Sequence, residues 1–173
     1  MGKTVAVIDT GFWSTCCRLG IADHLTTLWQ SSFIMPGAIL GEIFYRRSRY
    51  AGSRLFHDQA EFLAQFVAGR IVSQNPKAHV TTQFNAGERA VIDLALEING
   101  DVLIDEQRAH DYALQQGLDA ISVPEYVVAL LYENLVTLAI AERLFQTLIH
   151  GNRSPKDFLD YARDAIQGRG GKV

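Results

Sequence analysis

Acidic side chains occupy the positions in this sequence at which a catalytic cleft could form. Asp9 directly follows one β-branched apolar run, and Asp105 and Glu106 directly follow another. Glu88 stands in the first turn of the helical segment that leads into the second run, and Glu42 stands mid-helix between apolar neighbours. Carboxylates repel one another, so a group of them needs a cation in its midst. The pattern predicts a site for a hard divalent cation such as Mg²⁺ or Mn²⁺, which prefers oxygen ligands.

The chemistry that such a site would carry is metal-assisted hydrolysis of a phosphate ester. A bound divalent ion lowers the pKa of a water and stabilises the leaving oxygen of a phosphodiester. Most of the acids also have a structural alternative. Glu88 can complement a helix dipole, Asp9 can form a turn or a cap, and Asp105 with Glu106 can open a helix. Glu42 is the acid that this alternative explains least well.

Short apolar segments are predicted to be the strands that position these acids. They cover residues 4–8, 33–35, 101–104 and 120–123, with 71–73 as a short edge piece. The near-continuous apolar character of 4–8 is typical of a strand buried on both faces. Because helical segments separate the strands, the sequence predicts a three-layer α/β/α sandwich with a central parallel sheet of four to five strands, plus C-terminal helices. Ligands of such sheets bind beyond the carboxyl ends of the strands.

The helical segments are marked by apolar spacing and by start and stop signals. They cover residues 38–45, 53–67, 88–98, 107–116 and 125–149, the last with a break near Asn134. Ser154 and Pro155 open a final helix that runs to about Ile166. We expect a single domain over residues 1–167 and a disordered tail over 168–173.

Composition limits the classes of protein that this chain can be. Its 173 residues suit one domain, and 48% hydrophobic with 20% charged residues is a globular composition. No apolar run reaches the roughly 18 residues of a membrane span, so no membrane association is expected. The adjacent Cys16 and Cys17 fit neither a disulfide framework nor a zinc site, which favours a reducing, cytoplasmic compartment.

The net charge of −3 by itself argues against binding through bulk positive charge, nucleic acid included. Metal binding at the acids changes that reading. One divalent ion would bring the total to −1 (−3 + 2) and two would bring it to +1 (−3 + 4). The positions of the acids in the sequence therefore say more about nucleic-acid binding than the net negative charge does.

Four short motifs, in the same order along the chain, resemble those of the PIN-domain ribonucleases. They are AVIDT at 6–10, MPGAILGEI at 35–43, GERAVIDLA at 87–95 and LIDEQR at 103–108. The resemblance is closest to a prokaryotic, toxin-like branch with a Gly-Glu pair at the third motif. It implies that Asp9, Glu42 and Glu88 are catalytic metal ligands, and that the fourth ligand is Asp105 or Glu106.

The same resemblance implies an activity and partners. The protein is expected to be a metal-dependent endoribonuclease that uses Mg²⁺ or Mn²⁺ and acts as the toxin of a toxin–antitoxin pair. An antitoxin protein and a homodimeric assembly are the expected partners. Thr10 matches a position where the family often has Ser or Thr, so its hydroxyl is expected to support the site. Two departures are the Glu at the third acid, where Asp is commoner, and a fourth motif without the usual Thr-x-Asp form.

Several arginines are candidate contacts to RNA phosphates, because guanidinium groups bind phosphate in a bidentate manner. They are Arg46, Arg47, Arg49, Arg89 and Arg108. The alternative for the first three is a solvated helix end, and for the last two it is pairing with neighbouring acids. Phe12 and Trp13 are interpreted as core residues, with base stacking as the alternative.

Two other functions were weighed. A catalytically degenerate PIN-like module would bind RNA or a protein without cutting, but such a domain has no reason to keep mutually repelling carboxylates. A phosphoaspartyl phosphatase also places an Asp after its first strand. The sequence Asp9-Thr10-Gly11 lacks the second Asp that this class requires two residues later.

Overall fold

The computed structural model describes residues 5–29, 33–45, 53–151 and 154–170 as strands, helices and their connections. In chain order these are β1 (Ala6–Ile8), α1 (Thr10–Leu19), η1 (Ala22–His24), α2 (Leu25–Leu28), β2 (Phe33–Met35), α3 (Gly37–Tyr45), α4 (Ser53–Val67), β3 (Ile71–Ser73), α5 (Ala86–Ile98), β4 (Asp101–Leu103), α6 (Gln107–Gln115), β5 (Ala120–Ile121), α7 (Val123–Tyr132), α8 (Leu138–Gly151) and α9 (Lys156–Gly170).

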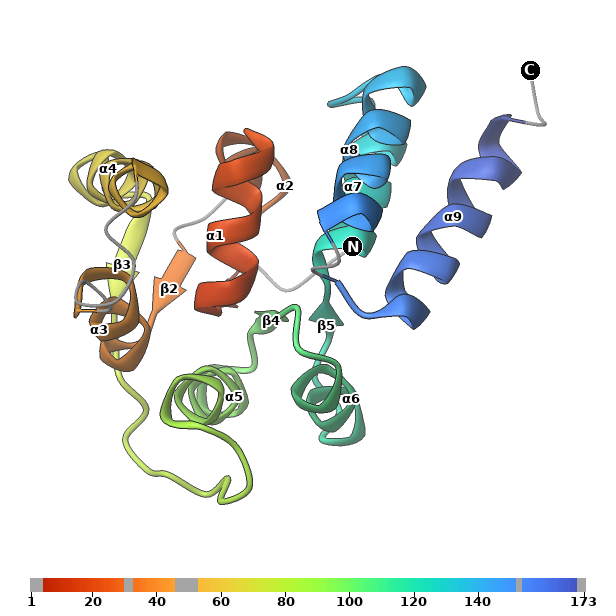
Figure 1. Cartoon of the computed structure of the whole chain (residues 1–173). Coiled ribbons are helices and arrows are strands. Elements are labelled where there is room, and N and C mark those ends of the chain that lie inside the picture. The colour runs from red at the N-terminus through yellow and green to blue at the C-terminus, as the bar shows by residue number, and fades with distance from the viewer. Residues whose placement is uncertain (1–4, 30–32, 46–52, 152–153, 171–173) are drawn as a thin grey trace.

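The strands form one parallel sheet in the order β3-β2-β1-β4-β5. Helices α1, α4 and α7 lie on one side of it and α5 and α6 on the other, while α8 and α9 pack beside α7 (Figure 1). This arrangement confirms the predicted three-layer α/β/α fold with additional C-terminal helices. The edge piece at residues 71–73 is a strand of the sheet.

The sheet order decides where a ligand can bind. From β1 the chain builds outward through β2 to β3, then returns to the other side of β1 for β4 and β5. The switch point therefore lies between β1 and β4, where Ile8 pairs with Leu103. The backbone N–H of Asp9 donates to the carbonyl of Leu103 at 2.9 Å. Consequently Asp9 and the residues after Leu103 lie at the same edge, where such sheets bind ligands.

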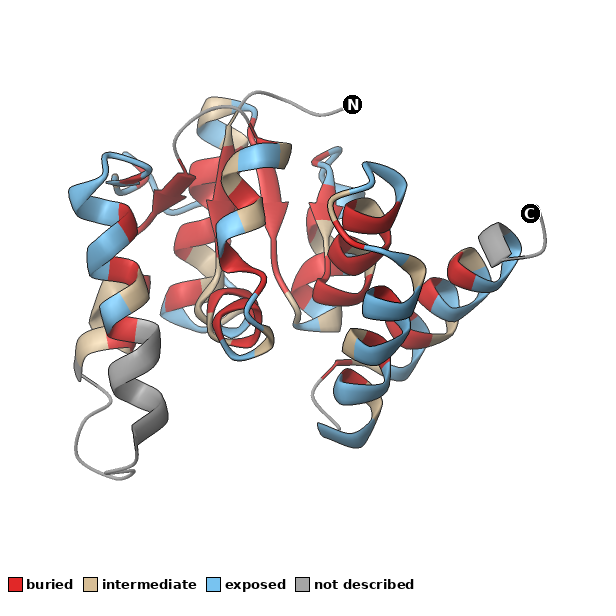
Figure 2. Ribbon diagram, turned by 90° about the horizontal axis from the view of Figure 1, so that it is seen from above, coloured by how far each residue is buried: buried red, intermediate tan, exposed pale blue. Residues whose placement is uncertain are grey.

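The core lies between the two helical layers and the sheet. Each residue of β1, β2 and β4 is buried, as Figure 2 shows for the strands at the centre of the molecule. Phe12, Trp13, Cys16 and Cys17 are buried in the same core, which confirms their interpretation as packing residues. Each fully buried side chain of this size contributes about 1.5–3 kcal/mol. The first helix is thus anchored immediately behind Asp9.

Helix ends differ in detail from the predicted ones. The helix expected from residue 125 begins at Val123, because Ser122 and Glu125 form a capping box at its start. It ends before Asn134, whose left-handed φ of 57° separates α7 from α8 as predicted. Helix α9 continues to Gly170, beyond the expected end near Ile166, while 171–173 lie outside the described residues. None of the described helices combines the length and apolar character that a membrane crossing requires.

Candidate active site

A pocket of about 410 Å³ lies at the carboxyl ends of β1 and β4. The predicted acids and Thr10 line it together with a few polar residues that the sequence did not single out. Its lining is Asp9, Thr10, Gly11, Ser14, Thr15, Arg18, Glu42, Asn85, Glu88, Asp105 and Glu106. We call this cavity the acid pocket. It gathers side chains from the ends of β1 and β4 and from α1, α3, α5 and α6.

Asp9 is the deepest acid and is held by the start of α1. It is the N-cap residue, and its Oδ2 accepts the backbone N–H of Gly11 at 2.8 Å. Burial raises its pKa to about 6, the Gly11 bond opposes that rise, and the charges of Glu42 and Glu88 add to it. The strand-to-helix turn thus fixes a carboxylate in a setting that disfavours its charge.

Glu42 and Glu88 approach each other where α3 meets the start of α5. A Cβ atom on Gly87 would lie 2.6 Å from Oε1 of Glu42, so glycine is required for the carboxylate to sit there. Glu88 belongs to a capping box, in which its N–H donates to Asn85 Oδ1 at 3.0 Å. Burial is the largest cause of the raised pKa of Glu88, and the charges of Glu106 and Glu42 contribute. The capping role that sequence reasoning allowed for Glu88 is real and coexists with its place in the pocket.

The structure separates the roles of Asp105 and Glu106. Asp105 Oδ1 accepts the N–H of Val123 at 3.1 Å, and its Oδ2 accepts the Ser154 hydroxyl at 2.9 Å. Asp105 therefore ties the end of β4 to the start of α7 and to the segment before α9. Burial raises its pKa to about 6 against these hydrogen bonds. Glu106 caps α6 through one oxygen, with Oε2 accepting the Ala109 N–H at 2.7 Å, and its charge contributes to the raised pKa of Glu88.

Two observations bear on whether a divalent cation fits the acid pocket. The hydroxyl of Thr10 is buried and has no hydrogen-bond partner among the described residues, so a polar atom in the pocket is left for a ligand. The lining is rich in carboxylate oxygens, which are the ligands of Mg²⁺ and Mn²⁺. As the side chains stand, no three acidic, cysteine or histidine residues in the described part of the chain form a group that could hold a metal ion. The residues thus fit a hard cation in the chemistry of their side chains.

Sequence reasoning missed three polar residues of α1 that line the pocket. Ser14, Thr15 and Arg18 follow Gly11 by 3, 4 and 7 positions (14 − 11, 15 − 11, 18 − 11), the spacing of one helical face. Arg18 Nη2 donates to Thr15 Oγ1 at 2.8 Å. That polar stripe, starting at the end of a predicted strand, is the signal that would have found them.

The two predicted arginine contacts that the structure describes do not line the acid pocket. Arg89 on α5 is half-buried and Arg108 on α6 is exposed, and neither is part of the pocket lining. Arg46, Arg47 and Arg49 lie outside the described residues. Their contacts to RNA stay predictions.

Comparison with known proteins places this geometry in a family. A family model for a PIN domain, DUF3368, matches residues 5–164. No curated protein matches the chain. Among solved structures, a PilT N-terminus domain protein from the hyperthermophilic archaeon Sulfolobus solfataricus P2 is similar at 17% identity and a TM-score of 0.45, over 70% of this chain and 88% of that one. A domain of a functionally unknown protein from Methanocaldococcus jannaschii is similar at 15% identity and a TM-score of 0.52, over 68% of this chain and 89% of that one.

The second of these structures supports the fold, and the family match carries the assignment because it spans nearly the whole chain. The same ordered motifs supply the carboxylates that line the acid pocket. This chain belongs to the PIN-domain family, whose members are typically nucleases.

Proposed function

We propose that this protein is an endoribonuclease that hydrolyses RNA phosphodiesters with Mg²⁺ or Mn²⁺ held in the acid pocket. The observation that carries the proposal is the convergence of Asp9, Glu42, Glu88 and Glu106 on one pocket at the switch point of the sheet. Burial is the largest cause of the raised pKa values of Asp9 and Glu88, and the charges of neighbouring acids add to both, so this arrangement is unfavourable without a cation. The family assignment supports the same chemistry.

Asp9, Glu42, Glu88 and Glu106 are the residues that we propose to hold the cation. Asp105 lines the same pocket, but both of its oxygens already accept hydrogen bonds from Val123 and Ser154, which supports a positioning role for it. When bound, the cation supplies Lewis-acid stabilisation of phosphate charge and lowers the pKa of a water.

The chain's own contribution is to fix the carboxylates and a polar hydroxyl before the substrate arrives. The N–H of Gly11 holds one oxygen of Asp9, and the capping box with Asn85 orients Glu88. The buried hydroxyl of Thr10 can hydrogen-bond a water in the pocket. Ligands that are fixed in advance can hold a cation without the penalty of reorganising during the reaction.

The test is cleavage of a labelled single-stranded RNA by the purified protein, with Mn²⁺ and with chelator. Internal cuts that require the metal are the expected result, and cuts that persist in chelator would contradict the proposal. Titration calorimetry with Mn²⁺ separates the alternative of a degenerate binding module. Absence of binding at about millimolar metal would favour that module, because a catalytic Mg²⁺ or Mn²⁺ site must fill in use.

We also propose that the protein acts in the cytoplasm as the toxin of a toxin–antitoxin pair and forms a homodimer, on the strength of its resemblance to the toxin-like branch. Exposed apolar side chains on α4 and the edge strand β3, namely Leu63, Phe66, Val67 and Val72, offer a surface for self-association. Induced expression should arrest growth, and co-expression of the product of a neighbouring small gene should relieve that arrest. Light scattering checks the dimer.

A further inference from the structure

A second cavity, of about 590 Å³, adjoins the acid pocket between α1 and α8. From α1 it takes Thr15 and Arg18, both of which also line the acid pocket. From α8 it takes Arg143, Gln146 and His150, among others. We call this cavity the arginine groove. Since two residues belong to both linings, the groove and the acid pocket share a wall.

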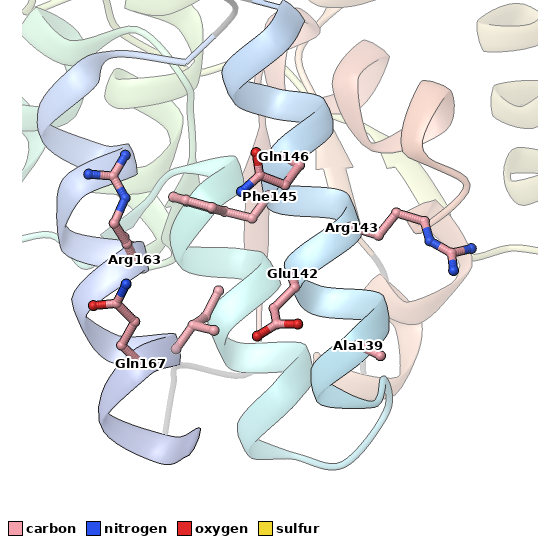
Figure 3. A pocket seen from close by; sticks show the side chains of 8 residues that line it. Ala139, Glu142, Arg143, Phe145, Gln146, Arg163 and Gln167 are labelled. Carbon is pink, nitrogen blue, oxygen red and sulfur yellow. The ribbon is translucent and has the colours of Figure 1, made fainter. Parts of the chain in front are cut away.

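The two cavities have opposite charge. Five carboxylates line the acid pocket, whereas the lining of the arginine groove contains two arginines, one histidine and no acid. Helix α8 has acid and amide side chains on its other flank, in the pocket that it forms with α9, where Glu142 lies opposite Arg163 and Gln167 (Figure 3). Arg143 points away from α9 in that view and completes the arginine groove with Arg18. Arg143 and Gln146 line both cavities, but the pocket beside α9 also contains Glu142, whereas the lining of the groove that faces α1 contains no acid.

Arg18 is fixed at the shared wall by its hydrogen bond to Thr15 at 2.8 Å. A guanidinium held in this way binds a phosphate with little further loss of side-chain freedom. The side-chain amide of Gln146, which also lines the groove, is a typical donor to phosphate oxygens in nucleic-acid complexes. The groove thus offers the contacts of a phosphate site directly beside the proposed site of hydrolysis.

We infer that the arginine groove binds the backbone phosphate next to the scissile one in a single RNA strand, with Arg18 and Arg143 as its contacts. This inference rests on the proposed function, because it assumes that the acid pocket receives the scissile phosphodiester. A strand with one phosphate there must carry its neighbouring phosphates past the pocket wall. Of the two cavities, the acid pocket repels further phosphates and the groove attracts them.

The groove is suited to a sugar–phosphate backbone and not to bases or to a docked helix. No Phe, Tyr or Trp side chain lines it, so it lacks a large aromatic platform on which a base could stack. The large exposed hydrophobic residues of the described chain, such as Phe66, Val67 and Tyr132, lie elsewhere. A partner helix would need such apolar anchors. Contact with the strand should therefore be independent of base sequence.

The test is RNA binding by the full-length Asp9→Asn protein, which we expect to bind without cutting, with and without Arg143→Ala. The probe is a fluorescein-labelled single strand of about 12 nucleotides, and anisotropy is followed between about 50 and 200 mM salt. Loss of Arg143 should weaken binding about three- to tenfold, and should lower the slope of log Kd against log salt by about 0.7, the value for one phosphate contact on a single strand. Arg143→Lys should keep the slope.

Arg70→Ala is the matched control, because Arg70 is an exposed arginine just before β3, at the opposite end of that strand from the site. It should leave affinity and slope unchanged, and thermal melting should show that all variants are folded. Equal affinity and slope in the parent and Arg143→Ala, an equal loss in both alanine variants, or no measurable binding by the parent would each overturn the inference. The inference would also be overturned if an acidic peptide bound in a manner that requires Arg143 while RNA binding did not require it.

The outcomes also separate the groove from the proposed activity. If wild-type protein cuts RNA with Mn²⁺ but Arg143→Ala binds normally, only the groove assignment fails. If Arg143-dependent binding is found but no metal-dependent cleavage, the proposed hydrolysis fails while the phosphate contact stands.

Discussion

Two carboxylates in neighbouring parts of this molecule, Glu125 and Asp9, have pKa values shifted in opposite directions. At the start of α7, Glu125 Oε2 accepts the N–H of Ser122 at 2.7 Å, its hydroxyl at 2.6 Å and a contact from His110 Nε2 at 3.2 Å. Burial works to raise the pKa of Glu125, yet the hydrogen bonds from His110 and Ser122 leave it lowered. In the acid pocket, burial raises the pKa of Asp9 and the charges of Glu42 and Glu88 raise it further, to about 6.

Burial acts in the same direction on the pKa of both carboxylates, and the neighbours that the fold supplies act in opposite directions. We call Glu125, His110 and Ser122 the α7 network. It surrounds its carboxylate with donors, so the charged form stabilises the native state. The acid pocket surrounds its carboxylates with carboxylates and leaves the Thr10 hydroxyl unpaired among the described residues. One arrangement serves stability, and the other reduces stability in a place where a ligand can reverse the effect.

The largest expected effect is that of Asp9→Asn. Asparagine keeps the N-cap of α1 but removes one charge from the acid pocket. Metal-dependent cleavage should fall on the order of 10³-fold. The melting temperature should stay equal or rise, by about 2–4 °C for each kcal/mol of relieved destabilisation. Gel assays with Mn²⁺ and thermal melts in chelator check both, and full activity in this variant would refute the assignment of Asp9.

The pH dependence of stability should show the same destabilisation. The pKa of Asp9 is about 6 in the native state against 3.8 for a free side chain, so between those values the native state binds more protons than the unfolded state. The free energy of unfolding should therefore fall as pH rises through this window and level off above it. The share of Asp9 is at most about 3 kcal/mol. Asp105 contributes with the same sign, because its pKa is also about 6.

Urea denaturation in chelator between about pH 4 and 7 measures that dependence. Asp9→Asn should flatten the curve by the share of Asp9. If the free energy of unfolding depends on pH in the same way in the wild type and in Asp9→Asn, the charged form of Asp9 is not destabilised by its surroundings.

Breaking the α7 network should have the opposite consequence for stability. Glu125→Ala leaves His110 and Ser122 without their shared acceptor and removes the capping box, so the free energy of unfolding should drop by about 2 kcal/mol. Glu133→Ala, an exposed acid at the other end of α7, is the matched control and should change little. Mn²⁺ affinity should be unchanged in both. A large loss of metal affinity in Glu125→Ala would make the α7 network part of the site.

Asp105 and Glu106 both line the acid pocket, and Asp105 also contacts the start of α7 through Val123. Glu106→Gln should lower Mn²⁺ affinity about tenfold with little change in stability. Asp105→Asn should instead cost about 1–2 kcal/mol, because an amide cannot accept from both Val123 and Ser154. Calorimetry with Mn²⁺ and urea denaturation of the two variants distinguish the two roles. A loss of Mn²⁺ affinity in Asp105→Asn and not in Glu106→Gln would make Asp105 the fourth ligand.

The smallest effect is expected for Gly87→Ala. Its new Cβ would displace the Glu42 carboxylate, which is the far end of a flexible side chain, so Mn²⁺ affinity should drop about threefold to tenfold while stability changes by less than about 1 kcal/mol. Gly41→Ala, also helical, has no atom within 4 Å of its Cβ position and should leave metal affinity unchanged. Equal affinities in the two variants would show that the position of Glu42 is unimportant.

Much of this fold could be predicted from local patterns. The apolar runs at β1, β2 and β4 and the left-handed break at Asn134 depend on residues close to one another in the sequence. The start of α7 was missed because its capping box lies where a strand pattern continues into Val123. A strand pattern and a helix start both fit Ser122 and Val123, and only the packed sheet shows that the helix start is the one adopted.

Local sequence is enough to predict that acids follow the strands and stand at helix starts, since strand ends and caps are encoded by near neighbours. The tertiary structure sets which of them share a pocket, because the pairing of β1 with β4 joins residues 95 positions apart (103 − 8). It also gives Asp105 and Glu106 different hydrogen-bond partners and places Arg18 and Arg143 in the lining of one cavity. Such choices depend on strand order and on the packing of α8 against the rest of the fold, and no local pattern specifies either.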